Sequence, residues 1–198
     1  MLLSSPHEQH AHAYPRHRSQ ADGTARLYLC WPVRTACHGS GAEGSFYHYF
    51  SSKEDYGCAL LSHYVDQYRG ELRQTLDNPA LSGRDQLLAY FTAWQDRQLS
   101  GQADQKCLIV KLGAEISDLS ADMRAILQTG VEAIVAKLAS CVRAAQSDGS
   151  LNATIDPQAT ATTVYQIWLG ASLMAHLSQD DRPFKTAMAQ TRALLPTS

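Results

Sequence analysis

The chain has 198 residues, and 17 Lys and Arg oppose 19 Asp and Glu, which gives a formal net charge of −2. This balance excludes a protein that coats nucleic acid by bulk positive charge, although it permits a local basic face. With 44% hydrophobic and 18% charged residues, the composition is that of a folded domain rather than a disordered chain.

No apolar run is long enough for a membrane helix, and the N-terminus lacks the basic-then-apolar pattern of a signal peptide. The five cysteines are odd in number and widely spaced, which favours free thiols in the cytoplasm over a disulfide framework. Cys30, Cys37 and His38 lie close together, but their spacing matches no common zinc pattern. We therefore expect no metal, no cofactor and no membrane partner.

Residues 1–43 show neither a helical nor a strand period. They contain five of the eight histidines and three of the seven prolines, but no lysine and no isoleucine. One interpretation is a disordered tail. A second interpretation depends on the motif that follows this segment.

From residue 44 onward the sequence predicts an all-α protein, because apolar residues recur at helical spacing and no segment alternates like a strand. Ser52 with Asp55, and Ser82 with Asp85, have the spacing of helix-capping boxes. Asp156 followed by Pro157 marks another helix start. The expected helices cover about 53–78, 83–99, 107–116, 120–145, 157–179 and 182–195.

The last two expected helices favour a homodimer. Small residues permit close helix packing, and six of them occur here: Thr160, Ala161, Thr163, Gly170, Ala171 and Ser172. Three larger residues add apolar surface: Trp168, Met174 and Leu177. Two such helices would complete a four-helix bundle with their symmetry mates. The alternative is that they pack only within one subunit.

The segment GSFYHYFSSKE begins at Gly44. Phe46 and Phe50 would face a core, which leaves Ser45, His48 and Tyr49 on the opposite face of a short helix and Tyr47 at its edge. Hydroxyl and imidazole groups can bond phosphates and base edges, and Lys53 could meet a phosphate. The alternative is an ordinary aromatic core helix.

This segment resembles the recognition helix and the start of the fourth helix of the TetR family of bacterial repressors. KCLIVKLGAEISDLSADMRAIL (106–127) and IWLGASLMAHL (167–177) resemble the regulatory domain of the branch that controls N-ethylmaleimide reductase and responds to electrophiles. The resemblance covers about residues 44–195. It implies an N-terminal helix-turn-helix domain and a C-terminal helical domain that binds a small molecule and dimerises. The operator would be contacted through Gly44, Ser45, Tyr47, His48, Tyr49 and Lys53.

The family has two helices before the recognition helix, where residues 1–43 show no helical pattern. Read one base out of frame, residues 13–36 can encode a helical string with a forced glycine at Trp31–Pro32. We therefore hypothesise that residues 1–43 are an aberrant, out-of-frame segment, whether from a sequencing error or a genuine mutation. Residues 44–56 would be the recognition helix and the rest of the DNA-binding domain, and residues 57–198 the regulatory and dimerisation domain.

Cys107 is the candidate sensor. It lies at an expected helix start, where the dipole favours a thiolate, and Lys106 and Lys111 flank it. The resemblance implies that Cys107 occupies the position of the cysteine with which electrophile-responsive relatives sense electrophiles. The alternative is a buried, inert thiol, as we expect for Cys58 and Cys141.

Aromatic side chains are the candidates for a small-molecule pocket. The main candidates are Tyr68, Phe91, Trp94, Trp168 and His176, with Tyr64, Tyr90, Met123 and Tyr165 as further candidates. Ordinary core packing is the alternative for each of them, and His176 in particular is expected to be packed.

Together these features predict a ligand- or redox-responsive repressor that small electrophiles release from its operator. The alternative is a dimeric small-molecule-binding protein that lacks DNA-binding competence because of its N-terminus. An enzyme using Cys107 and His176 is a third hypothesis, but no set of nucleophile, base and orienting residue supports it, so we expect no enzyme.

Overall fold

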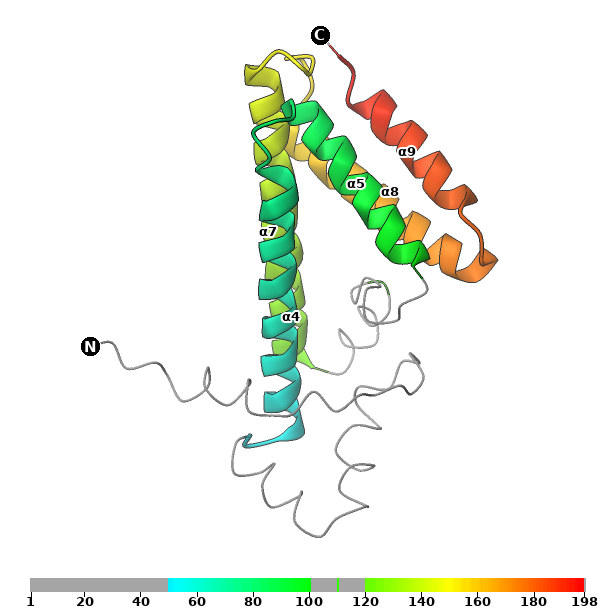
Figure 1. The fold of residues 1–198 in the computed structure, drawn as a ribbon. Coiled ribbons are helices and arrows are strands. Elements are labelled where there is room, and N and C mark those ends of the chain that lie inside the picture. The colour runs from blue at the N-terminus through cyan, green and yellow to red at the C-terminus, as the bar shows by residue number, and fades with distance from the viewer. Residues whose placement is uncertain (1–49, 101–109, 111–119, 198) are drawn as a thin grey trace, which may run out of the picture. The chain divides into compact units, whose positions relative to one another are not determined.

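A computed structural model describes residues 50–100, 110 and 120–197. Its helices are α4 (Lys53–Leu76), α5 (Gly83–Leu99), α7 (Ala121–Ser147), α8 (Pro157–Ser178) and α9 (Arg182–Leu194) (Figure 1). No strand occurs in these three ranges, so the all-α prediction is confirmed there. The expected recognition motif from Gly44 to Tyr49, and most of the expected helix at 107–116, lie outside the described residues.

Local capping sets where these helices begin, as the sequence predicts. The Ser82 hydroxyl accepts a hydrogen bond from the backbone N of Asp85 at 3.1 Å. The Ser120 hydroxyl accepts a hydrogen bond from the backbone N of Met123 at 3.2 Å, and the Asp156 carboxylate accepts one from the backbone N of Ala159 at 2.6 Å. Each bond satisfies a backbone N–H that the first helical turn leaves without a partner.

The chain divides into two compact units, Met1–His63 and Tyr64–Ser198. The division falls inside α4, later in the chain than the expected boundary at 56/57. In the first unit the Ser52 hydroxyl caps α4 by accepting a bond from Asp55 N at 3.0 Å. The Asp55 carboxylate in turn accepts bonds from the backbone N and hydroxyl of Ser51, at 3.0 and 3.2 Å.

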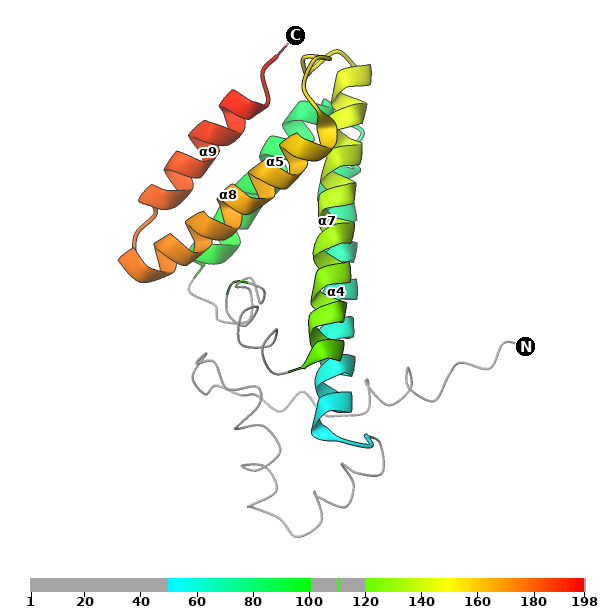
Figure 2. The same cartoon turned by 180° about the vertical axis from the view of Figure 1, so that it is seen from behind.

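In the second unit α7 packs against α5 and α8, and α9 covers α8 and part of α5 (Figures 1 and 2). One stripe of α7, including Leu127, Ile134, Leu138 and Val142, is buried. By length and composition α7 could cross a membrane, and no other helix in the described ranges could. Ile134, Leu138 and Val142 of this stripe lie in the core cluster shared with the neighbouring helices.

One end of this bundle is held by polar contacts between segments far apart in sequence. The Asp148 carboxylate accepts a bond from Gly83 N at 2.7 Å, at the start of α5. The Arg84 guanidinium donates to the Leu195 carbonyl at 2.8 Å. A Cβ at Gly83 would lie 2.6 Å from the Cα of Ala145, so only glycine permits this approach of α5 to α7.

Candidate functional site

A cluster of aromatic rings fills the space between α5, α8 and α9. Phe91 stacks on Trp168 with ring centroids 5.0 Å apart, and Trp168 stacks on Phe184 at 5.8 Å. Trp94 meets Tyr165 edge-to-face at 5.6 Å. All five side chains are at most 2% exposed. The structure therefore brings together four of the predicted pocket residues, Phe91, Trp94, Trp168 and Tyr165.

Both indoles of this cluster donate hydrogen bonds to hydroxyls. Trp94 Nε1 donates to Ser172 Oγ at 3.0 Å, and Trp168 Nε1 donates to Thr191 Oγ1 at 2.9 Å. Each hydroxyl also donates a hydrogen bond to the backbone carbonyl four residues earlier in its helix, with an oxygen–oxygen distance of 2.8 Å. Rings and polar groups thus satisfy one another in a packed core. A ligand-lining role for these four aromatic residues stays a prediction.

Tyr68 lies at the contact between α4 and α5 and joins the ring cluster through Tyr90, whose ring is 4.9 Å from that of Phe91 and 6.0 Å from that of Trp94. Its hydroxyl is 2.7 Å from the hydroxyl of Tyr90, and its ring stacks on Tyr64 with centroids 6.2 Å apart. Arg97 Cζ lies 6.0 Å from the Tyr68 ring centroid. Tyr90 is fully buried, and this burial raises the pKa of its hydroxyl well above the ordinary value. The Tyr90 hydroxyl is therefore neutral at physiological pH.

The cysteines differ in their surroundings. Cys141 is buried in α7, with its sulfur 3.6 Å from the Gly83 carbonyl, and burial raises the pKa of its thiol to about 11. This confirms the expectation of a core cysteine for Cys141. Cys58 is half-buried in α4. Cys107 lies outside the described residues.

His176 is exposed on α8, so the expectation that it is packed is wrong. The buried positions of α8 include Trp168, Ser172 and Ala175, which lie on one face of the helix. Residue 176 follows at about 100° from residue 175, and the helix turns it outward. His176 is therefore not part of the ring cluster.

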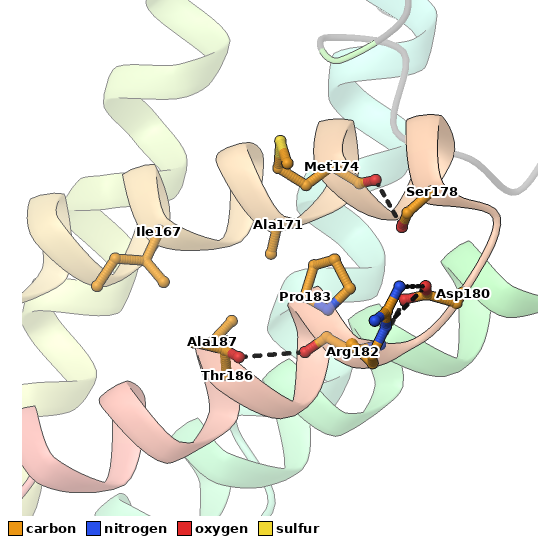
Figure 3. A pocket seen from close by; sticks show the side chains of 9 residues that line it. All are labelled: Ile167, Ala171, Met174, Ser178, Asp180, Arg182, Pro183, Thr186 and Ala187. Atoms are coloured by element: carbon orange, nitrogen blue, oxygen red, sulfur yellow. Dashed lines mark hydrogen bonds and ion pairs between the residues drawn. The ribbon is translucent and has the colours of Figure 1, made fainter.

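A groove of about 480 Å³ lies between α8 and α9 (Figure 3). Its lining residues come from both helices and the turn between them: Ile167, Ala171, Met174, Ser178, Asp180, Arg182, Pro183, Thr186 and Ala187. At the turn, the Arg182 guanidinium donates to Asp180 from Nε at 2.8 Å, and this hydrogen bond lowers the pKa of the Asp180 carboxyl. No sequence pattern predicted this groove, although two of its lining residues, Ala171 and Met174, were expected at a dimer surface.

Large apolar side chains of α8 are exposed near this groove. Leu173, Met174 and Leu177 are 49%, 55% and 69% exposed. Trp168, which was expected to add apolar surface for assembly, is instead fully buried. Its indole is held inward by Thr191 and its ring by Phe91 and Phe184.

Of the residues predicted to contact DNA, only Lys53 lies within the described part of the chain. Gly44, Ser45, Tyr47, His48 and Tyr49 lie outside the described residues. Lys53 is the first residue of α4, which is the helix start that the sequence predicts for it. Within the described ranges, no group of three or more His, Cys, Asp and Glu side chains could hold a metal ion.

Comparison with known proteins identifies the class. Residues 83–191 match the family model described as the tetracyclin repressor-like C-terminal domain. The chain therefore belongs to the TetR family of transcriptional regulators, as the motifs at Gly44 and in the regulatory helices predict.

Individual relatives are also similar to this chain. The HTH-type transcriptional repressor NemR of Escherichia coli (strain K12) is 34% identical over 155 residues, which cover 78% of each chain. The transcriptional regulator AcuR of Cereibacter sphaeroides is 37% identical over 139 residues, which cover 68% of this chain and 62% of AcuR. The crystal structure of reduced E. coli NemR matches with a TM-score of 0.78 and 32% identity, over 87% of this chain and 89% of that one. These relatives are transcriptional regulators, not enzymes.

Proposed function

We propose that this chain is a DNA-binding transcriptional repressor of the TetR family that a small electrophile releases from its operator. The observation that supports it most directly is the 34% identity to a transcriptional repressor over 78% of both chains. We further propose that it acts in the cytoplasm, where thiols are kept reduced and available for sensing.

Cys107 is the proposed point of attack. In the reaction, its thiolate forms a carbon–sulfur bond with the electron-poor β-carbon of a conjugated carbonyl compound, and the α-carbon then takes up a proton. Cys141 is unsuited to this step, because it is buried and the pKa of its thiol is raised to about 11. An adduct that favours the conformation with weak DNA affinity would shift the population away from the operator.

The proposed assembly is a homodimer through α8 and α9. Leu173, Met174 and Leu177 expose apolar surface on α8. The groove between the two helices offers a complementary surface in a second copy (Figure 3). Pairing α8 and α9 with their symmetry mates would form a four-helix bundle. Two reading heads about one DNA turn apart could then engage the half-sites of an operator.

The alternative function is that of a dimeric small-molecule-binding protein without DNA binding. The observation that favours it is the lack of an apolar helical pattern in residues 1–43. A recognition helix of seven residues is not stable in water without supporting helices. The chain as given would then keep its regulatory half but bind DNA poorly.

The test measures binding to the DNA immediately upstream of the gene by fluorescence anisotropy. It compares the chain as given with a frame-restored chain, each with and without N-ethylmaleimide. We expect the frame-restored chain to bind, and the electrophile to weaken its binding by about tenfold or more, which is within the range of ordinary allosteric coupling. The variant Cys107→Ser should keep binding in the presence of the electrophile.

The matched control is Cys141→Ser, which should still respond to N-ethylmaleimide because Cys141 is buried. Binding by neither chain would refute the repressor proposal and favour the alternative. Binding that remains sensitive in Cys107→Ser would refute the role of this cysteine while leaving the repressor in place.

A further inference from the structure

The contact between α4 and α7 includes a glycine that α4 packs against closely. Gly130 lies in the middle of α7, is buried and faces Val65 of α4. A Cβ at position 130 would lie 2.8 Å from Val65 Cγ2 and 3.1 Å from Val65 Cγ1. Side chains do not approach one another this closely, so the absence of a side chain at Gly130 permits this position of α4.

Val65 cannot relieve such a contact by itself. It is β-branched, and in a helix its χ1 angle strongly favours one rotamer. Both of its methyl groups already lie close to the position of the added Cβ. A methyl group at residue 130 would therefore have to displace the backbone of α4, of α7, or of both.

Two further contacts hold the second half of α4. The Tyr68 hydroxyl pairs with Tyr90 of α5 at 2.7 Å. Asp77, immediately after α4, forms an ion pair with Lys137 of α7. Val65 precedes both contacts and is the second residue after the division between the two units at His63/Tyr64. Of these three contacts, that of Val65 is nearest in sequence to the division between the two units.

We infer that Gly130 is a positioning residue: it forms a notch in α7 that seats Val65 and thereby sets the position of α4, the helix whose residues belong to both units. This inference rests on the proposed function, because it gives the notch a role in operator affinity. Filling the notch should weaken operator binding by about 2- to 30-fold, the range for residues that modulate coupling without touching a ligand.

The central variant is Gly130→Ala in the frame-restored chain. Its matched control is Gly70→Ala in α4, because a Cβ at Gly70 would meet nothing within 4 Å. The double variant Val65→Ala/Gly130→Ala removes the two methyl groups that the new Cβ would meet, and it should restore affinity. This rescue distinguishes displacement of α4 from a general loss of folding.

Two measurements are made on each variant: hydrogen exchange of the α4 amides, which needs no DNA, and anisotropy with the upstream DNA. In Gly130→Ala we expect faster exchange in α4 around Val65 and in the facing turn of α7, with α8 and α9 unchanged. Operator binding should weaken in the same variant, and both effects should be absent from Gly70→Ala.

Unchanged exchange in Gly130→Ala would overturn the inference, even if no chain binds DNA. Faster exchange with unchanged operator affinity would overturn the positioning role. Failure of all chains to bind DNA would refute the proposed repressor function, and the exchange measurement would then still show whether Gly130 seats α4.

Discussion

Two buried hydroxyls in the regulatory unit illustrate how single residues complete an aromatic core. Ser172 and Thr191 each accept a hydrogen bond from an indole and donate one to a carbonyl of their own helix. A serine or threonine in a helix commonly bonds to the carbonyl four residues earlier. Here that bond orients the oxygen lone pairs toward the tryptophans, so large rings are buried without leaving an N–H unpaired.

Thr191→Val should therefore destabilise the protein. Valine keeps the shape of threonine but removes the acceptor of Trp168 Nε1, and both Thr191 and Trp168 are fully buried. The cost of an unsatisfied buried donor is about 1–3 kcal/mol. Urea unfolding at neutral pH, followed by circular dichroism, measures this loss in the free energy of unfolding.

Thr162→Val is the control for this substitution, because the Thr162 hydroxyl makes the same type of helix bond to Gln158 at an exposed site. Its effect should stay within about 0.5 kcal/mol, as is usual for surface substitutions. Equal losses in the two variants would show that the indole bond contributes nothing.

For single residues, the sequence shows which side chains are apolar but did not always predict correctly which of them are buried and which are exposed. Trp168 and Met174 lie on the same helix, yet the structure buries the first and exposes the second. α8 is apolar around much of its circumference, so periodicity alone does not identify the inner face. The outward position of His176 was missed for the same reason.

Among the elements, helix starts were predictable because a cap acts over three residues. Ser82 and Asp156 each accept a hydrogen bond from the backbone N three positions later, as expected, and Ser120 at the start of α7 does the same. The start of α9 differs: the Asp181 side chain makes no capping bond, and Asp180 instead accepts a bond from Arg182 N at 3.0 Å. Contacts such as Asp148 with Gly83 join residues 65 apart, and no local pattern predicts them.

The contact of Asp148 with the start of α5 predicts a pH dependence of stability. Hydrogen bonds from Ser150 and from Gly83 N lower the pKa of the Asp148 carboxyl in the folded protein. The unfolded chain then binds more protons than the folded chain near pH 4, close to the ordinary pKa of an aspartate. The stabilisation is present above that pH and is lost as pH falls through the folded pKa.

Asp148→Asn removes this titration while keeping an amide oxygen as acceptor. Between about pH 6 and pH 3, its urea midpoint should fall less steeply than that of the unsubstituted chain. Asp96→Asn, an exposed aspartate on α5, is the control and should leave the slope unchanged. A slope that is the same in Asp148→Asn and in the unsubstituted chain would contradict this assignment.

For the whole molecule, the GSFYHYF motif and the regulatory segments predicted the family correctly, whereas the candidate site was predicted only in part. The aromatic residues Phe91, Trp94 and Trp168 were identified, but their close packing depends on α9 residues such as Phe184 and Thr191. Those contacts join helices that are distant in sequence. Their geometry becomes evident only in the folded chain.

The proposed homodimer should depend on the exposed apolar side chains of α8. Leu177→Glu places a charge on the most exposed large apolar side chain of α8, which is 69% exposed. Burying an unpaired carboxylate in an interface is costly, so dimer affinity should fall by about tenfold or more. Sedimentation equilibrium or light scattering at micromolar concentration would detect the resulting monomer.

Leu99→Glu is the matched control, because Leu99 is also an exposed leucine but lies at the end of α5. It should leave the assembly unchanged. If Leu177→Glu remained dimeric, the interface would have to lie elsewhere; if the unsubstituted protein were monomeric, the dimer proposal would fail.

The stacked rings also provide an optical probe within the regulatory unit. Two of the three tryptophans in the sequence, Trp94 and Trp168, are buried with ring centroids 6.1 Å apart. Fixed, asymmetric indole pairs contribute to near-ultraviolet circular dichroism, and this signal disappears when specific packing loosens. The protein therefore reports on the integrity of its own interior without an added label, and a substitution that leaves this spectrum intact has spared the core.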